Sequence, residues 1–498
     1  MGASVAVQTA ILHGMEALPV RVEVSTSAGI PGITMVGLPD SAVLESRSRI
    51  RCAIRNSALR MPREHITVNF APGELRKSGT GLDLPVAVSI LCSSGQMPLT
   101  GLDSCLFVGE LALEGNIRPT RGMLAYQRLA ESMGLALVCS PESGCLGSYE
   151  RCLGVAALGE IARGVPWVTR HCRRPSPADD HSCEHAPATL DFADVVDQES
   201  AKRAIAIAVA GGHGLLMVGP PGSGKTMLAR RIPRIMPPLS PAEKDEALLV
   251  ASVAGRDATE LQLGNRPFRS PHHSISLAGM IGGGRPVLPG EVTLAHRGVL
   301  FLDELPEFAC NVLQSLRQPL EERCVRLIRA EGAFAFPCDF LFVAAANPCP
   351  CGYLGDPVRP CSCSETRVAQ YQSRIGGPLM DRIDVRVDVA RPDASKVIGG
   401  REGLSTEDMT RMVLRARERQ EERGDAGALN SRLPLSQISL EADARSVLER
   451  MSARLALGGR SIVRVARVAR TIADLEGSDR VRRGHVVEAC MYRDRSGV

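Results

Sequence analysis

The sequence has few aromatic residues, few lysines and no long apolar run. Aromatic side chains make up 3% of the 498 residues, with a single Trp, so aliphatic residues and Met must fill most of any core. No apolar run approaches the ~18 residues needed to cross a bilayer. The N-terminal segment MGASVAVQTA also lacks the basic start of a secretory signal. We therefore expect a cytoplasmic protein and not a membrane-spanning or secreted one.

The chain nevertheless has enough apolar residues for several cores. Hydrophobic residues make up 44% and charged residues 23%, which excludes a largely disordered chain. At roughly 150 residues per domain, the length predicts about three domains. Lys and Arg together number 59 against 55 acidic residues, and five of the 59 are lysine. Residues 441–498 contain 12 arginines and 8 acidic residues. This mild basic excess permits contact with nucleic acid without establishing it.

Hydrophobic periodicity divides the chain into two α/β regions and a helical C-terminal region. Residues 1–170 form the first region. Residues 171–189 are crowded with Pro, Asp, His and Ser and are predicted to be a linker. Strand and helix signals alternate again over residues 190–392, and residues 393–498 are predicted to be helical. In the first region, strands are expected at 20–26, 65–72, 105–113 and 135–140 and an amphipathic helix at 42–59.

Residues 219–226, GPPGSGKT, match the phosphate-binding pattern G-x-x-x-x-G-K-[ST]. They follow the apolar strand LLMV and open a helix, the context that the pattern requires. Backbone N–H groups of such a loop surround a phosphate, and the start of the helix adds partial positive charge. Lys225 is expected to reach the β- and γ-phosphates of ATP, and the Thr226 hydroxyl to bind Mg²⁺. The predicted nucleotide-binding residues are Gly219, Pro220, Pro221, Gly222, Ser223, Gly224, Lys225, Thr226 and Asp303.

Two further buried strands end in polar residues that complete an ATPase site. The run VLFL (299–302) leads into Asp303 and Glu304. Asp303 is predicted to hold Mg²⁺, and Glu304 to polarise the attacking water as a general base. The run FLFVAAA (340–346) ends at Asn347, whose amide can orient that water. Two acids after a strand can also form a solvated turn, and an Asn before Pro is often a plain turn residue.

These motifs together resemble the AAA+ ATPases, and within them the magnesium-chelatase-like ComM/YifB family. The resemblance covers nearly the whole chain and implies a ring, usually hexameric, with ATP at the subunit interfaces. It implies a sensor-1 role for Asn347, an arginine finger at Arg382 with Arg374 in reserve, and a sensor-2 role for Arg460. In an arginine-rich chain, surface charge is the plain alternative for all three arginines. The strings that carry the resemblance are DFADVVDQESAKRAIAIAVAGGH, FRSPHHSISLAGMIGGG, LPGEVTLAHRGVLFLDELPEF, NPCPCGYLGDPVRPCSC and RIGGPLMDRIDVRVDV.

Two segments need separate interpretation. Asp197 stands in VVDQ where the family usually has Gly, which leaves the adenine side of the site less defined. Residues 279–292, GMIGGGRPVLPGEV, resemble the helix-2 insertion of this AAA+ branch, a Gly-rich hairpin that projects into a ring pore and grips a polymer. A surface loop is the alternative for this segment.

Residues 1–170 resemble the fold shared by the Lon protease domain and ribosomal protein S5, through GELALEGNIRPTRGML. Lon-type proteolysis needs a nucleophilic Ser and an activating Lys. Where the Ser would fall the chain reads GTGLDLP (79–85), and the Lys position falls near Leu124. The domain is therefore predicted to be non-proteolytic, with a role in substrate binding or ring assembly.

Sixteen cysteines are many for a chain without an export signal, and one group is clustered. Cys349 and Cys351, then nine residues, then Cys361 and Cys363 form two C-x-C pairs. Thiols stay reduced in the expected compartment, so a metal is favoured over disulfides. Four thiolates suit a closed structural Zn²⁺ site, although the pairs are closer than the commoner spacing. A turn with free thiols is the alternative. The adjacent His272 and His273 are expected to point apart and to have a positioning role.

The resemblance implies an ATP-driven ring motor on DNA, because the ComM branch is associated with branch migration of recombination intermediates and with natural transformation. Its expected partners are further copies of the chain, DNA and recombination proteins. One alternative is a chelatase motor subunit that inserts Mg²⁺ into a porphyrin, and another is a remodeller of protein complexes. The Lon/S5-like domain argues against the chelatase subunit, whose motor domain normally begins near the chain start. The motifs do not exclude the remodeller.

Overall fold

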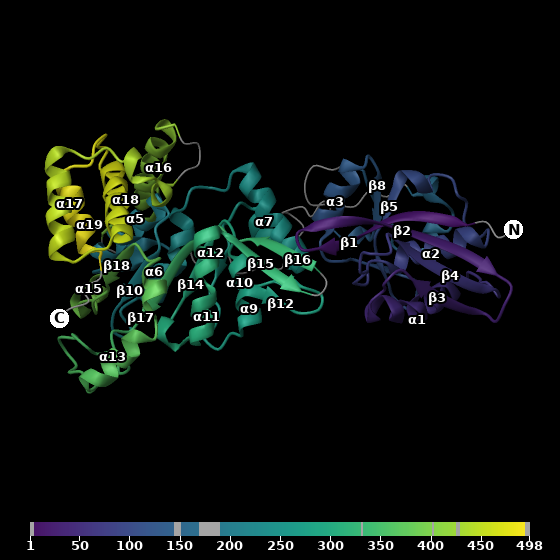
Figure 1. Cartoon of the computed structure of the whole chain (residues 1–498), viewed down its shortest axis with the longest axis horizontal. Helices are drawn as coiled ribbons and strands as arrows, with labels where there is room; N and C mark the ends of the chain where they lie inside the picture. Colours follow the sequence, from purple (N-terminus) through teal and green to yellow (C-terminus); the bar gives the residue numbers. More distant parts are fainter. Residues whose placement is uncertain are drawn as a thin grey trace.

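The computed structural model describes residues 4–143, 151–168, 190–329, 332–400, 403–424 and 429–493. Figure 1 shows an elongated molecule with the N-terminal α/β region at one end and the C-terminal helices at the other. The second α/β region lies between them. The predicted linker, residues 171–189, lies outside the described ranges. Within those ranges no helix has the length and apolar character needed to cross a membrane.

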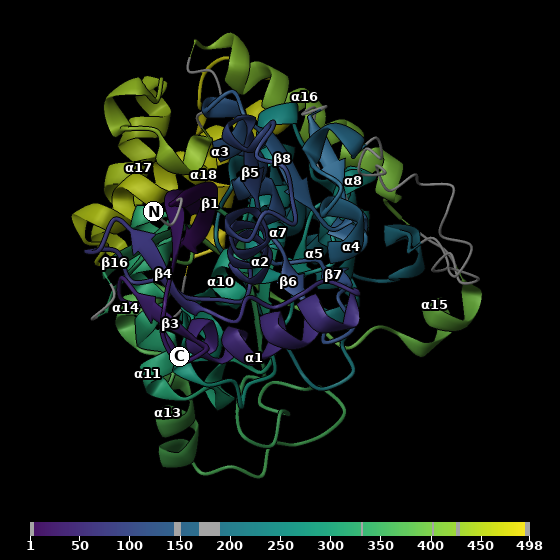
Figure 2. The same cartoon turned by 90° about the vertical axis from the view of Figure 1, so that its right-hand side faces the viewer.

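A seven-stranded mixed sheet forms the N-terminal region, which faces the viewer in Figure 2. Because side chains alternate along a strand, Val5 and Val7 of β1 pack toward α1 and α2, whereas Ala10 packs toward α3 on the other face. The predicted strands at 20–26, 65–72 and 135–140 and the helix at 42–59 are confirmed, with shifted ends. The predicted strand at 105–113 is instead two strands, β5 and β6 (Glu110–Leu111), and β6 pairs with β7 (Ile117–Arg118) outside this sheet. In spatial order the strands are β3 (Gly32–Val36), β4 (His65–Ala71), β2 (Glu16–Ser27), β1 (Val5–His13), β5 (Cys105–Phe107), β8 (Ala136–Cys139) and β9 (Cys152–Gly154), and the helices are α1 (Ser41–Asn56), α2 (Asp83–Ser93) and α3 (Met123–Ser132).

A five-stranded parallel sheet forms the central region. Strands β10 and β14 are four-residue apolar runs buried on both faces, as expected for parallel strands covered by helices on each side. Helices α5 (Glu199–Gly211) and α6 (Lys225–Ile235) pack on one face, and α9 to α12 on the other. In spatial order the strands are β11 (Phe268–Arg269), β14 (Val299–Leu302), β17 (Leu341–Ala346), β10 (Leu215–Val218) and β18 (Val385–Asp388), and the second set of helices is α9 (Leu277–Ile281), α10 (Glu291–Leu294), α11 (Cys310–Ser315) and α12 (Arg317–Glu322).

The C-terminal helices share one hydrophobic core with the central sheet. Val465 and Ile472 of α18 belong to the same buried cluster as Ile205 of α5 and Met217 of β10. Together with the central sheet, they confirm the predicted α/β fold with a parallel core and a helical C-terminal region. The main helices of this region are α16 (Thr406–Glu422), α17 (Ala442–Arg454), α18 (Gly459–Leu475) and α19 (Arg483–Met491).

Contacts between α3 and α7 (Pro241–Ala254) join the N-terminal region to the central one. The amide of Gly122 donates to the carbonyl oxygen of Ser252 at 2.8 Å, and the amide of Leu124 to the Ser252 hydroxyl at 3.1 Å. Leu124 also packs in a small apolar cluster with Leu248. The junction therefore combines directed backbone bonds with burial of apolar side chains.

Candidate functional site

The phosphate loop lies at the carboxyl end of β10. The Gly219 amide donates to Ala346 at 3.1 Å, and a Cβ on Gly219 would lie 2.1 Å from the Val389 carbonyl oxygen, so a larger residue does not fit. Gly222 and Gly224 have positive φ values of 78° and 92°, the left-handed conformation that glycine adopts without strain. The first turn of α6 has no intrahelical acceptor for its amides, which leaves these N–H groups for an anion. The predicted cradle therefore forms, and its shape fits a nucleotide's phosphates.

Lys225 and Asn347 meet at the mouth of this loop. The Lys225 ammonium donates to the carbonyl oxygens of Gly219 at 2.8 Å and Pro220 at 2.9 Å, and it lies 3.3 Å from Asn347 Oδ1. Burial lowers the pKa of Lys225, while the charges of Asp303 and Glu304 act in the opposite direction. A phosphate entering the loop would replace those carbonyl acceptors and restore a full counter-charge.

Thr226 and Asp303 also come together. The Thr226 hydroxyl donates to Asp303 Oδ2 at 2.7 Å, so strand β14 delivers the carboxylate directly beside the start of α6. A hydroxyl and a carboxylate oxygen at this separation are hard oxygen donors of the kind that Mg²⁺ prefers. The pair fits the magnesium ion that accompanies ATP.

Glu304 has a strained backbone and a histidine neighbour. Its φ is 52°, which is uncommon for a residue other than glycine. His273 Nδ1 lies 3.4 Å from Glu304 Oε2. The rings of His272 and His273 lie with their centroids 4.0 Å apart and their planes tilted by 34°, so the expectation that adjacent histidines point apart is wrong. Both residues lie in a turn rather than on a strand, which lets the rings meet. The contact with Glu304 agrees with a positioning role for His273.

Asp197 has a left-handed backbone conformation, which an aspartate can adopt in place of a glycine. Its φ is 60°, the left-handed region that Gly enters freely and Asp tolerates better than most residues. Its carboxylate accepts from the Lys396 ammonium at 2.6 Å and from the Asp393 amide at 3.0 Å. The hydrogen bond from Lys396 lowers the pKa of Asp197. Asp197 therefore keeps the turn and gains a tie to the segment after β18.

Arg382 lies at the opposite edge of the sheet from the phosphate loop. The amides of Asp384 and Val385, just after it, both donate to the carbonyl oxygen of Gly214, which precedes β10. The phosphate loop begins five residues later at Gly219, about 16 Å along an extended strand. Arg382 pairs with Glu321 of α12. The structure does not bring Arg382 to the phosphate loop of its own chain.

Arg460 lies near that same edge. It is an exposed residue at the start of α18, and the neighbouring Ser461 accepts from Arg493, which also contacts the carbonyl oxygen of Ile383 at 3.4 Å. One turn further along α18, Arg464 lies 3.5 Å from Asp384. The structure therefore groups Arg460 with Arg382 rather than with Lys225.

Arg374, the reserve candidate, lies elsewhere. It follows α13 (Glu365–Ser373), and its guanidinium is 3.5 Å from Glu307, close behind Glu304 in the chain. More than half of this side chain is exposed. Arg374 is thus on the side of the sheet that carries the chain's own phosphate loop.

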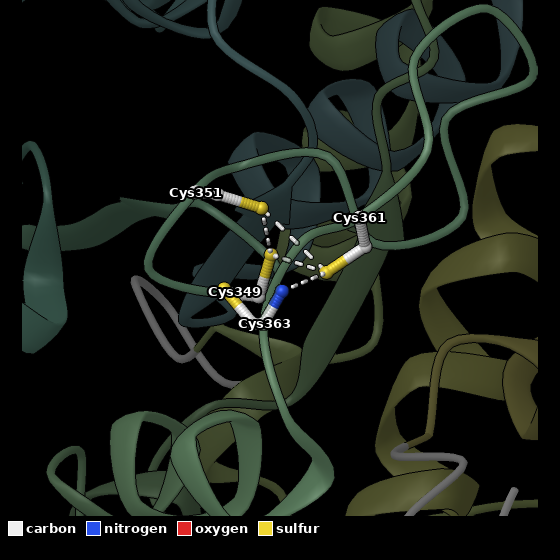
Figure 3. A group of neighbouring side chains, drawn as sticks. All are labelled: Cys349, Cys351, Cys361 and Cys363. Atoms are coloured by element: carbon white, nitrogen blue, oxygen red, sulfur yellow. Dashed lines mark hydrogen bonds between the residues drawn. The ribbon is translucent and has the colours of Figure 1, made fainter.

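The four clustered cysteines converge, as Figure 3 shows. The Sγ atoms of Cys349, Cys351 and Cys361 lie 3.3 to 3.6 Å apart, and all four sulfurs, with that of Cys363, lie within 4.8 Å of one another. Sulfurs around a tetrahedral Zn²⁺ with ~2.3 Å bonds are about 3.8 Å apart. Hydrogen bonds from the amides of Tyr353 and Ser362 lower the pKa of Cys351 to about 5. The donor set therefore fits a tetrathiolate metal site.

The cysteine loop contacts the phosphate loop. A Cβ on Gly352 would lie 2.6 Å from Pro221 Cδ, and Gly352 has a φ of 84° that favours glycine. Asn347 precedes the first cysteine by two residues. Whatever fixes the cysteine loop thus also fixes one wall of the nucleotide site.

The Gly-rich segment 279–292 forms the predicted hairpin. Its strands β12 (Gly282–Gly283) and β13 (Leu288–Pro289) are antiparallel. A second, longer hairpin lies beside it, made of β15 (Cys324–Arg329) and β16 (Gly332–Pro337). A Cβ on Gly283 would be 3.4 Å from a guanidinium nitrogen of Arg329. The exposed arginines Arg285, Arg326 and Arg329 therefore belong to neighbouring hairpins.

In the N-terminal region, Tyr126 rather than Leu124 faces the segment where a Lon-type nucleophile would stand. A Cβ on Gly81 would lie 3.8 Å from the Tyr126 hydroxyl oxygen, whereas Leu124 packs against α7. Burial raises the pKa of Tyr126, so it stays neutral. Neither Gly81 nor Tyr126 is the Ser or Lys that Lon-type proteolysis needs, and the non-proteolytic role of the domain stays a prediction.

Comparisons with known proteins match the chain over nearly its full length. Family profiles described as magnesium chelatase subunit ChlI match residues 191–397 and 22–143, and a ChlI C-terminal profile matches residues 403–493. The chain is 39% identical over 502 residues to YifB of Escherichia coli, covering 98% of this chain and 96% of that protein. It is 37% identical over 495 residues to the competence protein ComM of Haemophilus influenzae, covering 96% and 95%. It is 36% identical over 479 residues to a Mycobacterium tuberculosis protein, Rv2897c, covering 94% of each.

Proposed function

The chain belongs to the magnesium-chelatase-like AAA+ family that includes YifB and ComM, and we propose that it is an ATP-hydrolysing ring motor acting on DNA. Its expected role is branch migration of recombination intermediates, with natural transformation as one setting. The observation that carries the DNA assignment is the pair of neighbouring hairpins with exposed arginines, on a chain similar throughout its length to a competence protein.

In this proposal each residue of the nucleotide site has a separate task. Lys225 and the first amides of α6 hold the β- and γ-phosphates. Thr226 and Asp303 would hold Mg²⁺, which neutralises phosphate charge when bound. Glu304 accepts a proton from the attacking water, and Asn347 orients that water toward the γ-phosphate. His273 holds the Glu304 carboxylate through its 3.4 Å contact until the water is in place.

The DNA proposal predicts ATP turnover that responds to DNA structure and salt. Forked or four-way-junction DNA should stimulate hydrolysis more than linear duplex, because a motor needs an arm to pull. DNA affinity should fall steeply with salt and depend little on sequence. Replacing Arg326 and Arg329 by Gln should lower the slope of log K against log salt by about 2, since each lost phosphate contact removes about 0.9. The measurements are ATPase rates and fluorescence anisotropy between 50 and 200 mM salt, values chosen to span the range in which such contacts are screened.

The control for that experiment is Arg411→Gln, an exposed arginine on α16 that pairs with Glu407. It should leave both the slope and the stimulation unchanged. Stimulation of ATP hydrolysis by a porphyrin would favour the chelatase subunit. Stimulation of ATP hydrolysis by an unfolded polypeptide would favour a protein remodeller. Indifference to every DNA form at low salt, in a preparation shown to form rings, would reject the DNA motor.

We also propose that the four cysteines hold one structural Zn²⁺. With four thiolates the coordination sphere is closed, so the metal fixes the loop rather than taking part in chemistry. Because Gly352 of this loop packs on Pro221, the ion would support the wall of the nucleotide site. The same contact predicts that loss of the metal weakens ATP binding as well as fold stability.

We expect about one zinc per chain in protein purified without added metal, measured by elemental analysis. The double change Cys361→Ser and Cys363→Ser should remove it, because two of four ligands are lost. The matched control is Cys52→Ser together with Cys310→Ser, two exposed free cysteines outside the cluster, which should retain the metal. A zinc content near zero in the unaltered chain would reduce the cluster to plain thiols.

A further inference from the structure

A large cavity lies at the edge of the central sheet opposite the phosphate loop. Its volume is about 1010 Å³, and it runs between the starts of β10, β14 and β17 on one side and the C-terminal helices on the other. Arginines dominate its charged lining. The charged residues that line it are Arg266, Arg297, Arg323, Arg382, Arg417, Arg432, Arg464 and Arg467, with Glu243, Glu321, Asp339, Asp384, Glu418 and Glu421.

Three arginines of this cavity share one carboxylate. Asp339 accepts from Arg297 at 3.0 Å and from Arg432 at 2.7 Å, and it lies 3.2 Å from Arg323. A single negative charge therefore faces three positive ones. Burial acts to raise the pKa of Asp339, but the combined charges and hydrogen bonds of the arginines, Arg432 first, outweigh it and lower the pKa. Arg297 also donates to Glu246 at 2.8 Å, so among the described residues two carboxylates lie within 3.2 Å of these three arginines, and one guanidinium charge is left without a match at that distance.

Arg417 adds a further charge, and no carboxylate in the described part of the chain is in hydrogen-bond contact with it. Its guanidinium donates to the carbonyl oxygen of Val209 at 2.7 Å, and its buried Nε has no partner. The buried Nε of Arg432 has none either. Glu418 and Glu421, the acids nearest to Arg417 in the chain, are exposed to solvent, which screens their charge.

The arginines of this cavity repel one another. Burial and then the charge of Arg266 lower the pKa of Arg417 to about 10. Burial also lowers the pKa of Arg266 and of Arg323. Arg266 itself is held by the carbonyl oxygens of Pro237 and Arg297 and by Glu243 at 3.2 Å. Desolvated cations with too few counter-ions create a strong local demand for an anion.

We propose that Arg266, Arg297, Arg323, Arg417 and Arg432, here called the arginine groove, bind a phosphate-bearing anion with more than one phosphate group. Guanidinium groups bind phosphate oxygens in a planar, bidentate geometry, and all five of these arginines line the cavity. The cavity is too large for a single phosphate. The ligand is either the backbone of a nucleic acid or a soluble oligophosphate.

A bound anion would connect two regions of the chain. Arg266, Arg297 and Arg323 belong to the central region, whereas Arg417 and Arg432 belong to the C-terminal helical region. A ligand that contacts both sets would hold the helices against the sheet edge. Arg382 also lines this cavity but does not belong to the arginine groove, because its proposed role is at the nucleotide of a neighbouring subunit. The site stands independently of the DNA-motor proposal.

The test uses the full-length Lys225→Ala chain, so that the phosphate loop does not compete for phosphate. Binding of sodium tripolyphosphate is measured by calorimetry, and binding of a labelled single-stranded oligodeoxynucleotide by anisotropy. Arg417→Gln should weaken the binding at least tenfold, equal to ~1.4 kcal/mol. Arg415→Gln is the matched control on the same helix, exposed and outside the cavity, and should bind as the parent does.

Arg323→Gln is a second variant. We expect position 323 to tolerate substitution more easily, because 37% of the Arg323 side chain is exposed. It should weaken binding in the same direction, and thermal melting checks that each variant folds. If the two substitutions weaken binding of the oligonucleotide alone, the ligand of the groove is a nucleic acid. If they weaken binding of tripolyphosphate alone, the ligand is a soluble oligophosphate. Absence of binding by both probes, or equal binding by Arg417→Gln, Arg323→Gln and Arg415→Gln, would overturn the proposal.

Discussion

Glu304→Gln should bind ATP as the unaltered chain does and hydrolyse it about 100- to 10,000-fold more slowly, the range expected when a general base is lost. The amide keeps the size of the carboxylate but cannot take a proton from water. Thr226 and Asp303, 2.7 Å apart, remain to hold the metal, and Lys225 remains at the mouth of the loop. The defect should therefore lie in turnover and not in affinity.

Lys225→Ala should give the opposite pattern. Removing the ammonium removes a charge-assisted contact with two phosphates, so ATP affinity should fall by about a hundredfold, or ~2.7 kcal/mol. Binding is measured with a fluorescent ATP analogue and hydrolysis by phosphate release. Glu260→Gln, an exposed carboxylate of the central region paired with Asn265, is the control for the charge change. Equal ATP affinity in Lys225→Ala and the unaltered chain, or a normal rate in Glu304→Gln, would refute these assignments.

The phosphate loop and its two neighbouring strands could be predicted because their signals are local. Runs such as VLFL and FLFVAAA are apolar at every position, which specifies strands buried on both faces. The residues that follow such strands must meet at one edge of a parallel sheet. Asp303, Asn347 and the loop 219–226 were thus brought together by topology that short motifs already imply.

Other features depend on contacts between distant segments and left no local signal. Asp339 gathers arginines from positions 297, 323 and 432, and no periodicity links these positions. The rings of His272 and His273 lie close together because both residues are in a turn, whereas alternation along a strand would separate them, and His273 also contacts Glu304. The sequence alone did not explain why Asp197 can stand where a glycine was expected. Its φ of 60° does, because Asp tolerates the left-handed region better than most residues.

Arg382, the proposed arginine finger, lies far from the phosphate loop of its own chain. The resemblance implies that Arg382 reaches the γ-phosphate of a neighbouring subunit, whereas for Arg460 it implies a sensor-2 role without naming the subunit. Both residues lie toward the amino ends of the parallel strands, whereas Lys225 and Asp303 lie at the carboxyl ends. A rigid strand of this length separates the two groups by more than a side chain can reach. We therefore propose that Arg382 acts on the nucleotide of a neighbouring subunit.

Arg382→Ala should lower ATP hydrolysis by about 10³- to 10⁵-fold in homogeneous rings, the range associated with loss of an arginine finger. Its own nucleotide site is intact, so ATP binding should persist. Mixing it with Lys225→Ala subunits should restore part of the activity, because some interfaces then combine an intact phosphate loop with an intact Arg382. Arg374→Ala, tested in the same way, separates the two candidates, since Arg374 lies on the side of the chain's own site. Mixtures that exchange subunits, shown by energy transfer between labelled chains, yet regain no activity would exclude Arg382 as the residue acting across the interface.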